Sequence, residues 1–224
     1  MITSVYLLTH KMIKKLNDAG LRELQISIDN IKPDNVSVKS LKVLDRKLQL
    51  LEKHAEFTIN INSVLGISEE RTRDAIAVAQ KAIEYGFSHS VGLVHDGNGI
   101  LKPLSRDQYQ VYLEIGKITK SFVHYLNKAI FQKNLIDGKP NNWKCRAGAR
   151  YLYICEDGLV HWCSQQRGYP GIPLEAYTIK DIRREYNTQK SCSPFCTVNC
   201  VQQMSFLDGW RSQQRLPGPK LVHT

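Results

Sequence analysis

All six cysteines of this 224-residue chain lie within 56 consecutive positions, and the first 144 residues contain none. They are Cys145, Cys155, Cys163, Cys192, Cys196 and Cys200. Thiolates are ligands of zinc and of iron–sulfur clusters. In a chain without secretory features, cysteines gathered in this way are typical of a metal site rather than of disulfide bonds. The stretch therefore predicts a metal or iron–sulfur centre.

The residues between Cys145 and Cys163 predict a β-hairpin. Residues 151–155 and 159–163 are strand-like, and residues 156–158, Glu-Asp-Gly, form a typical turn between them. Folding the second strand back brings Cys163 towards the segment ahead of the first strand, which carries Cys145. The two cysteines are 18 positions apart in the sequence, and the hairpin allows both to bind one centre.

A zinc ion takes four ligands and a four-iron cluster takes four thiolates, so six cysteines exceed the needs of one site. We expect the ligands to come from Cys145, Cys163, Cys192, Cys196 and Cys200. The spare cysteine, or the ligand of a second site, is expected to be Cys155, because strand alternation places it beside Tyr151 and Tyr153 as a small buried apolar residue. His161 is either a ligand or, as we favour, a packed residue of the hairpin.

Composition narrows the class of protein. The chain is 42% hydrophobic and 23% charged, as in globular proteins. No apolar run is long enough to span a bilayer, and no charged leader precedes residue 9, so we expect a cytoplasmic protein without a membrane partner. The net charge of +10 suggests an anionic partner. The basic residues are scattered at helix-like intervals, however, which is typical of solvated helix faces and makes nucleic acid an unfavoured partner.

The first hundred residues alternate between strand and helix patterns. Strands are predicted at residues 2–8, 24–29, 57–65 and 88–95. Three helices are predicted between these strands. The first runs from Thr9 to Gly20, with Met12, Ile13 and Leu16 on one face. The apolar face of the second carries Val38, Leu41, Leu44, Leu48 and Leu51, and the third runs from Ser68 to Gly86 with Ile76, Ala79, Ala82 and Ile83 on one face. This rhythm indicates βαβ units and a parallel sheet, whose ligands bind at the carboxyl ends of the strands.

Further elements follow this sheet. A helix with an aromatic stripe that we expect to face the core runs from Ser105 through residues 109–125 to a boundary near Pro140. A second helix is expected to begin at Thr178-x-x-Asp181. Residues 169–173 are predicted to be a loop, and the tail after residue 212 to be loose. Four strands do not close a barrel and leave the first strand as an edge, so a preceding segment is expected to be missing.

The spacing of the cysteine stretch resembles a known module. Cys145, twelve residues, Gly158, four residues and Cys163, followed by further cysteines, is similar to the auxiliary iron–sulfur module of many radical S-adenosylmethionine (SAM) enzymes, the SPASM or shorter Twitch domain. The downstream part has only two x3 steps, whereas the full module carries more cysteines. The resemblance therefore implies the single-cluster variant, with one auxiliary 4Fe-4S cluster.

The N-terminal half resembles the radical SAM partial barrel. Residues 16–29 are similar to its helix and fourth strand, and Val64-x-Gly66-x-x-Glu69 is similar to its adenosine-contacting segment, with Asn62 where glycine is usual. The residues that the resemblance places at S-adenosylmethionine are Ser27, Asp29, Asn62, Val64, Gly66, Glu69 and Val94. Ser27 and Asp29 would lie near its ribose or methionyl part, and Val94 near adenine.

The resemblance implies an α/β protein with an incomplete TIM-like β/α barrel and a small cysteine-rich domain. Its parts would be residues 1–100 of the barrel, a helical connector at 101–140, the cysteine-rich domain at 141–212 and the tail. The family's CxxxCxxC motif is lacking. A complete relative is an oxidoreductase that cleaves S-adenosylmethionine reductively and abstracts hydrogen from a substrate, here suggested to be a peptide or protein. This chain is expected to be a fragment, inactive alone, that needs the missing segment or a partner chain.

Two alternatives remain open. A non-catalytic zinc protein would use the same thiolates and would be colourless, whereas a cluster makes a protein brown. A nucleic-acid-binding protein would explain the net charge, and its affinity would fall steeply with salt.

Overall fold

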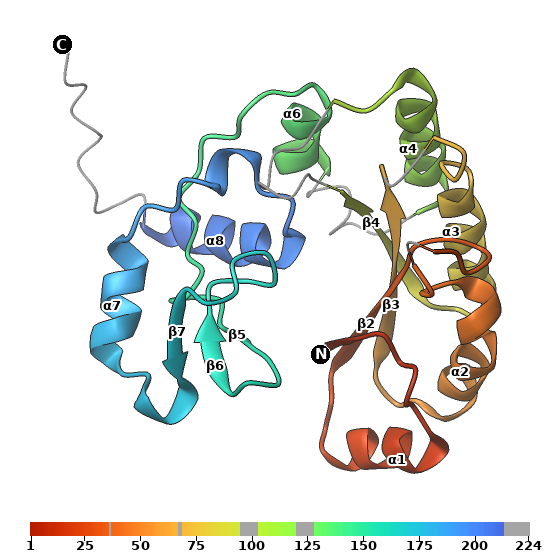
Figure 1. Cartoon of the computed structure of the whole chain (residues 1–224), viewed down its shortest axis with the longest axis horizontal. Coiled ribbons are helices and arrows are strands. Elements are labelled where there is room, and N and C mark those ends of the chain that lie inside the picture. The colour runs from red at the N-terminus through yellow and green to blue at the C-terminus, as the bar shows by residue number, and fades with distance from the viewer. Residues whose placement is uncertain (36, 67–68, 95–102, 120–127, 213–224) are drawn as a thin grey trace. The chain divides into compact units, whose positions relative to one another are not determined.

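The computed structural model describes residues 1–35, 37–66, 69–94, 103–119 and 128–212 (Figure 1). The chain divides into two compact units, Met1–Gly138 and Lys139–Thr224. Some expected features fall outside the described residues: the cap at Ser68, the strand end at residues 95–97, the end of the aromatic stripe at Phe122 and Tyr125, and the tail at 213–224. The finer division into four parts stays a prediction.

The first unit is built on a parallel sheet. Its strands are β1 Ile2–Thr3, β2 Glu23–Ile28, β3 Thr58–Leu65 and β4 Ser88–Leu93, in the order β1-β2-β3-β4. Each neighbouring pair is parallel, and β1 pairs with β2 alone, at an edge of the sheet. The predicted α/β class and parallel sheet are therefore confirmed.

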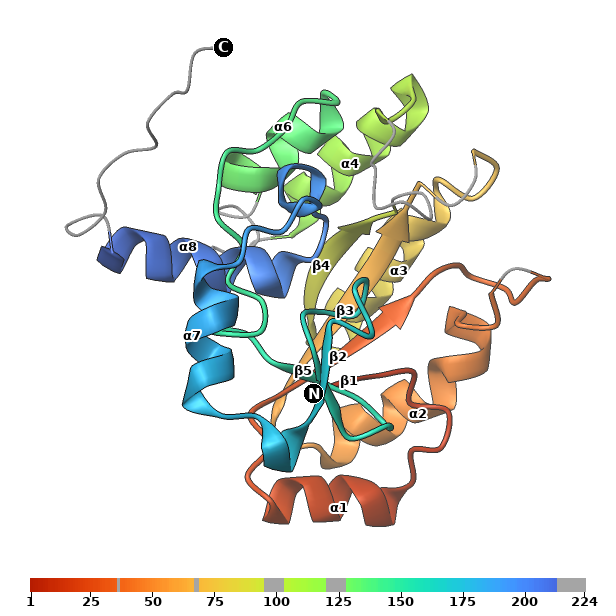
Figure 2. The same cartoon turned by 60° about the vertical axis from the view of Figure 1, so that its left-hand side comes forward.

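Helices connect successive strands of this sheet. They are α1 His10–Asp18, α2 Leu41–His54 and α3 Asp74–Glu84, and they are followed by α4 Arg106–Ile118, the π-helical turn η1 Lys128–Gln132 and α6 Lys133–Ile136. Figure 2 shows α1, α2 and α3 on one face of the sheet. This placement follows from right-handed crossovers between strands in sequential order.

The two faces of the sheet differ in chemistry. The face towards the helices is apolar: Leu24, Ile26, Ile28, Ile59 and Ile61 pack with Ile13, Leu44, Leu48, Leu51, Val78 and Ala82. The alternate positions are mostly polar: they carry Glu23, Gln25, Ser27, Thr58, Asn60, Asn62, Ser88 and Ser90, with Val64 and Gly92 near the carboxyl ends of β3 and β4. Parallel sheets are usually covered by apolar residues on both faces, so the polar face is a distinctive feature of this unit.

Several predicted details are wrong. The first strand ends at Thr3 instead of residue 8, because Val5 adopts a φ of 53° and the chain turns there, with the Leu8 amide donating to the Val5 carbonyl at 3.0 Å. Three residues predicted on buried helix faces are substantially exposed, namely Met12, Val38 and Ile83. Val38 precedes α2, whose first residue is Leu41.

The second unit combines a small antiparallel sheet with helices. Its elements are β5 Tyr153–Ile154, β6 Leu159–His161, β7 Pro170–Pro173, the 3-10 turn η2 Leu174–Ala176, α7 Ile179–Asn187, the 3-10 turn η3 Ser193–Phe195 and α8 Asn199–Ser212. The loop predicted at residues 169–173 is wrong, because β7 pairs with β6 and Ile172 lies opposite Val160. The Tyr169–Pro170 peptide bond is cis. Within the described parts of both units, no helix is long and apolar enough to cross a bilayer.

Candidate metal centre

The predicted hairpin positions Cys163. β5 and β6 are antiparallel, with Tyr153 opposite His161. The turn between them contains Gly158 at a φ of 70°, a left-handed conformation that favours glycine. Asp157 stabilises the turn, since its Oδ1 accepts a hydrogen bond from the Leu159 amide at 2.9 Å. Cys163 follows β6 by two residues and returns towards the segment ahead of β5.

Five of the six cysteines are brought together from three segments. Cys145 precedes the hairpin and Cys163 follows it, and both are 6% exposed. They belong to one packed cluster with Ala147, Val201, Trp143, Tyr151, Trp162, Val198 and Cys200. Cys192 immediately precedes η3, Cys196 immediately follows it, and Cys200 lies in the first turn of α8. We call Cys145, Cys163, Cys192, Cys196 and Cys200 the five-thiol cluster.

The thiols of this cluster influence one another electrostatically. Burial raises the pKa of Cys145 to about 11, and the neighbouring Cys192 and Cys163 add to the rise. Burial likewise raises the pKa of Cys196, and the neighbouring Cys145, Cys163 and Cys192 add to that rise. Burial also raises the pKa values of Cys163, Cys192 and Cys200. Without a metal these thiols are protonated at neutral pH, so a metal that binds them must displace protons.

The sulfurs of the five-thiol cluster do not lie at the spacing that one zinc ion requires. A tetrahedral zinc ion with Zn–S bonds of about 2.3 Å holds its sulfurs roughly 3.8 Å apart. All six cysteines lie among the described residues, and no three thiols of the five-thiol cluster have sulfurs within 4.8 Å of one another. In this structure the five thiols are therefore not arranged as the ligands of one zinc ion.

A buried ion pair fixes the segment that carries Cys145. The next residue, Arg146, is 2% exposed, and its Nε lies 3.0 Å from Oδ2 of Asp208 in α8. Its backbone amide donates to Oγ of Ser205 at 2.8 Å, and its Nη1 donates to the carbonyl of Tyr186 in α7 at 2.7 Å. The guanidinium lies 3.7 Å from the centroid of the Tyr186 ring. These contacts hold α7 and α8 against the Cys145 segment.

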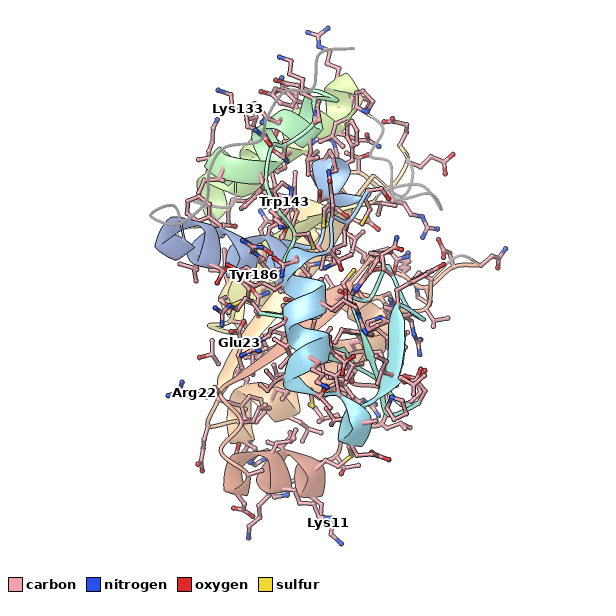
Figure 3. The ribbon with its side chains drawn as sticks, turned by 90° about the vertical axis from the view of Figure 1, so that its left-hand side faces the viewer. Lys11, Arg22, Glu23, Lys133, Trp143 and Tyr186 are labelled. Carbon is pink, nitrogen blue, oxygen red and sulfur yellow. The ribbon has the colours of Figure 1, made fainter. Side chains whose placement is uncertain are left out.

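A tryptophan makes a second link within this unit. The indole Nε1 of Trp143, labelled with Tyr186 in Figure 3, donates to the carbonyl of Ser193 at 2.6 Å. Ser193 lies in η3, between Cys192 and Cys196. The link therefore ties the segment ahead of Cys145 to the turn that carries two other members of the five-thiol cluster.

The sixth cysteine lies in a different group at the hairpin turn. The ligand atoms of Cys155, Asp157 and His161 all lie within 4.8 Å of one another and could hold a metal ion. Cys155 Sγ is 3.3 Å from Asp157 Oδ1, and His161 Nε2 is 3.0 Å from Asp157 Oδ2. The expectation of a buried apolar Cys155 is wrong, because this thiol is only partly buried and contacts both Asp157 and Arg167.

The hydrogen bonds of His161 oppose metal binding at this turn. The Gly168 amide donates to Nδ1 of His161 at 2.9 Å, so Nδ1 carries the lone pair and Nε2 carries the proton. A metal on Nε2 would require the proton on Nδ1, where it would meet the Gly168 N–H. Arg167 Nη2, 3.0 Å from Cys155 Sγ, adds a positive charge. The group is therefore better explained as a hydrogen-bond network that holds the turn.

From the sequence, Asp157 was predicted only as a turn residue. The available signal was its position on one hairpin, two residues after a cysteine and four before a histidine. In a tight hairpin these three side chains can meet at the turn, as they do here.

The residues predicted to contact S-adenosylmethionine lie on the polar face and beyond the carboxyl ends of the strands. Ser27 lies opposite Asn62 in the register, and Asn62 lies opposite Ser90, whose Oγ donates to Asn62 Oδ1 at 3.1 Å. Gly92 leaves room for the Asn62 amide, since a Cβ there would lie 2.6 Å from Asn62 Nδ2. The structure thus joins Ser27 and Asn62 in one row of polar side chains.

The other predicted contacts are distributed around this edge. The side chain of Asp29 accepts a hydrogen bond from Ser37 Oγ at 2.6 Å. Gly66 follows Val64 with a φ of 102° and packs beside Val94. Glu69 is exposed and accepts a hydrogen bond from Ser105 Oγ at 2.9 Å, at the N-terminus of α4. Glu69 is therefore engaged in holding a helix end.

In a comparison of the chain with known proteins, no family model and no curated protein sequence matches it.

Proposed function

We propose that the second unit binds one iron–sulfur cluster through Cys145, Cys163 and at least two of Cys192, Cys196 and Cys200. The observation that carries the proposal is that five thiols from three segments, two buried and three partly buried, lie close enough to influence one another electrostatically. Bound there, a 4Fe-4S cluster supplies one-electron transfer or an iron site for a substrate group. The residues of this chain would hold it, exclude water and set its electrostatic surroundings.

The surroundings of the thiols support this assignment. Trp143, Tyr151 and Trp162 pack against the buried side chains of Cys145, Ala147, Cys163 and Val201, where they would restrict access of water. The Arg146–Asp208 pair and the Trp143–Ser193 hydrogen bond fix the segments that supply the ligands. Five neighbouring thiols from three segments are enough to supply the four thiolates that a 4Fe-4S cluster takes.

The first unit supports a finer proposal, that its sheet is part of a radical SAM-type barrel. The polar row containing Ser27 and Asn62 lies on the face opposite the helices, the face that lines the interior of a β/α barrel. Hydroxyl and amide groups there would bind the polar parts of S-adenosylmethionine. Residues 1–144 contain no thiol ligand for a SAM-cleaving cluster, so we assign these residues a binding role and the cysteine-rich unit the role of an auxiliary centre.

Anaerobic reconstitution with iron and sulfide tests the proposal. The Cys145→Ala and Cys163→Ala variants are expected to lose most of their iron and their broad visible absorption. Cys155→Ala is the matched control and is expected to retain both, because Cys155 lies in the separate group at the hairpin turn. Unchanged iron content in the first two variants would contradict the assignment.

Zinc is the second candidate: the ligand atoms of Cys155, Asp157 and His161 lie close enough to hold one ion at the hairpin turn, although the contacts of Gly168 and Arg167 oppose it. It predicts a colourless protein whose zinc content falls in Cys155→Ala and stays constant in Cys145→Ala. Metal analysis of the same three variants therefore separates the two candidates. The nucleic-acid alternative rests on net charge alone, and a salt titration of binding tests it.

A further inference from the structure

A lysine side chain is buried within the cysteine-rich unit. Lys190 is 2% exposed, its Nζ donates to the backbone carbonyl of Glu185 at 2.6 Å, and it lies 3.5 Å from Glu185 Oε2. Removing an ammonium group from water costs several kcal/mol, which one carboxylate seldom repays in full. The position of this charge therefore calls for a reason beyond its pairing with Glu185.

Lys190 is not the only partner of the Glu185 carboxylate. Its Oε2 also accepts a hydrogen bond from Trp162 Nε1 at 2.6 Å, and its Oε1 accepts one from Arg184 Nε at 3.0 Å. Two cations thus share one carboxylate, which leaves a net charge of +1 over Arg184, Glu185 and Lys190. Arg184 is about half exposed, so water screens its charge, whereas Lys190 is shielded from water.

Lys190 is also close to the five-thiol cluster. Its Nζ lies 5.1 Å from the centroid of the Trp162 ring, and Trp162 directly precedes Cys163. Cys192 follows Lys190 by two residues. The positive charge of Lys190 lowers the pKa values of Cys145 and Cys192, opposing the effect of burial. The ammonium thus acts on ligands from two of the three segments.

We propose that Lys190 is the counter-charge of the thiolate centre, a positioning residue that strengthens metal binding and favours the reduced state of the bound cluster. Four thiolates make such a centre negative, and reduction by one electron makes it more so. A fixed positive charge in a medium of low dielectric constant stabilises both forms, and the reduced form more. The part that concerns reduction rests on the proposed iron–sulfur function, whereas the part that concerns metal binding does not.

Two opposite charge changes test the proposal on the full chain. Lys190→Met removes the positive charge and keeps most of the side-chain volume, and Lys190→Arg keeps the charge. Glu185→Gln removes the opposing negative charge. In reconstituted protein titrated with dithionite, Lys190→Met is expected to shift the one-electron equilibrium about tenfold towards the oxidised cluster, which is about 59 mV. Lys190→Arg is expected to stay near the wild type, and Glu185→Gln to shift the equilibrium towards the reduced cluster.

The double variant Lys190→Met/Glu185→Gln distinguishes an effect of charge on the potential from an effect of misfolding. It removes both charges and leaves no unpaired buried ion, so its potential is expected to lie between those of the two single variants. A wild-type potential in Lys190→Met, or a shift of Lys190→Met and Glu185→Gln in the same direction, would overturn the proposal in favour of a purely structural role.

Binding of Co²⁺ to the metal-free chain separates this inference from the proposed function. Lys190→Met is expected to bind Co²⁺ about tenfold more weakly than Lys190→Arg, judged by the sulfur-to-cobalt absorption bands. If no iron–sulfur cluster forms but this difference appears, the iron–sulfur function fails and Lys190 remains the counter-charge of a mononuclear thiolate site. If Co²⁺ binds equally to both variants, or to neither, the inference about Lys190 is wrong.

Discussion

Each of the two units of this chain is stabilised internally in a different way. The first buries large aliphatic side chains between a sheet and its helices, among them Ile13, Ile26, Leu48 and Ile61. The second buries few apolar side chains and several polar or charged ones, including Arg146, His161, Glu185, Lys190 and Asp208. The first unit thus relies on hydrophobic burial, whereas the second relies on paired charges and, as we propose, on a metal centre.

This difference has an energetic consequence. A fully buried aliphatic side chain contributes about 1.5 to 3 kcal/mol to folding, and that contribution does not depend on a cofactor. Buried ion pairs contribute little net stability, although breaking one is costly. A small unit buries a smaller fraction of its surface than a large one, so a bound metal can supply a larger share of its stability. We therefore expect the metal to stabilise the second unit selectively.

Removal of the metal is the change with the largest expected effect. A structural metal–thiolate site can contribute on the order of 10 kcal/mol to folding. Hydrogen exchange of the metal-free full chain is expected to show loss of protection in α8 and the β5–β6 hairpin, with β2 and β3 unchanged. Equal protection of α8 with and without metal would show that the two units do not differ in this respect.

Asp208→Asn is expected to have the next largest effect, because it leaves the buried guanidinium of Arg146 without its carboxylate. The expected loss is about 3 to 5 kcal/mol in the second unit. All three tryptophans of the chain lie after residue 138, so tryptophan fluorescence during urea unfolding reports on this unit. The control is Glu175→Gln at an exposed position, where a change below about 0.5 kcal/mol is expected.

Ile61→Ala tests how far the stability of the first unit depends on its apolar core. Ile61 lies in β3 and is 1% exposed, so truncation should destabilise the first unit by about 2 to 5 kcal/mol. Hydrogen exchange in β2 and β3 measures this loss, and the metal content of the second unit is expected to stay at the wild-type value. Met12→Ala, at an exposed position of α1, is the control. A fall in metal content in Ile61→Ala would mean that the two units are energetically coupled.

Comparing Gly148→Ala with Gly158→Ala tests how tightly the side chains around Glu185 are packed in the second unit. Gly148 and Gly158 both have φ near 70–80°, so alanine is strained at either position. A Cβ at Gly148 would lie 2.9 Å from Cγ of Glu185, whereas one at Gly158 would meet nothing within 4 Å. We expect Gly148→Ala to be less stable than Gly158→Ala by about 1 kcal/mol, measured by urea unfolding. Equal stabilities would show that the packing around Glu185 tolerates a methyl group.

Much of the fold could be predicted because its signals are local. Thr9 caps α1 by accepting from the Met12 amide at 3.2 Å, and Gly20 follows this helix with a φ of 68°. The capping box between Thr178 and Asp181 at the start of α7 is also confirmed, with the Thr178 amide donating to Asp181 Oδ2 at 2.9 Å. Alternating strand and helix patterns were sufficient to predict the parallel sheet.

Features that depend on distant contacts were missed. β7 contains two prolines and reads as a loop, yet it pairs along one edge with β6, where missing amide donors are tolerated. Glu185 and Lys190 were not singled out from the sequence, because nothing local reveals that Trp162 contacts both of them. The separation of Cys155 from the other five cysteines was expected from strand alternation, whereas its contacts with Asp157 and Arg167 depend on the fold of the hairpin.

Iron and acid-labile sulfide in the chain purified without oxygen test the central claim most directly. The account predicts about four iron and four sulfide atoms per chain and a brown protein with broad absorption in the visible. A colourless protein that contains zinc, or no metal at all, would contradict it.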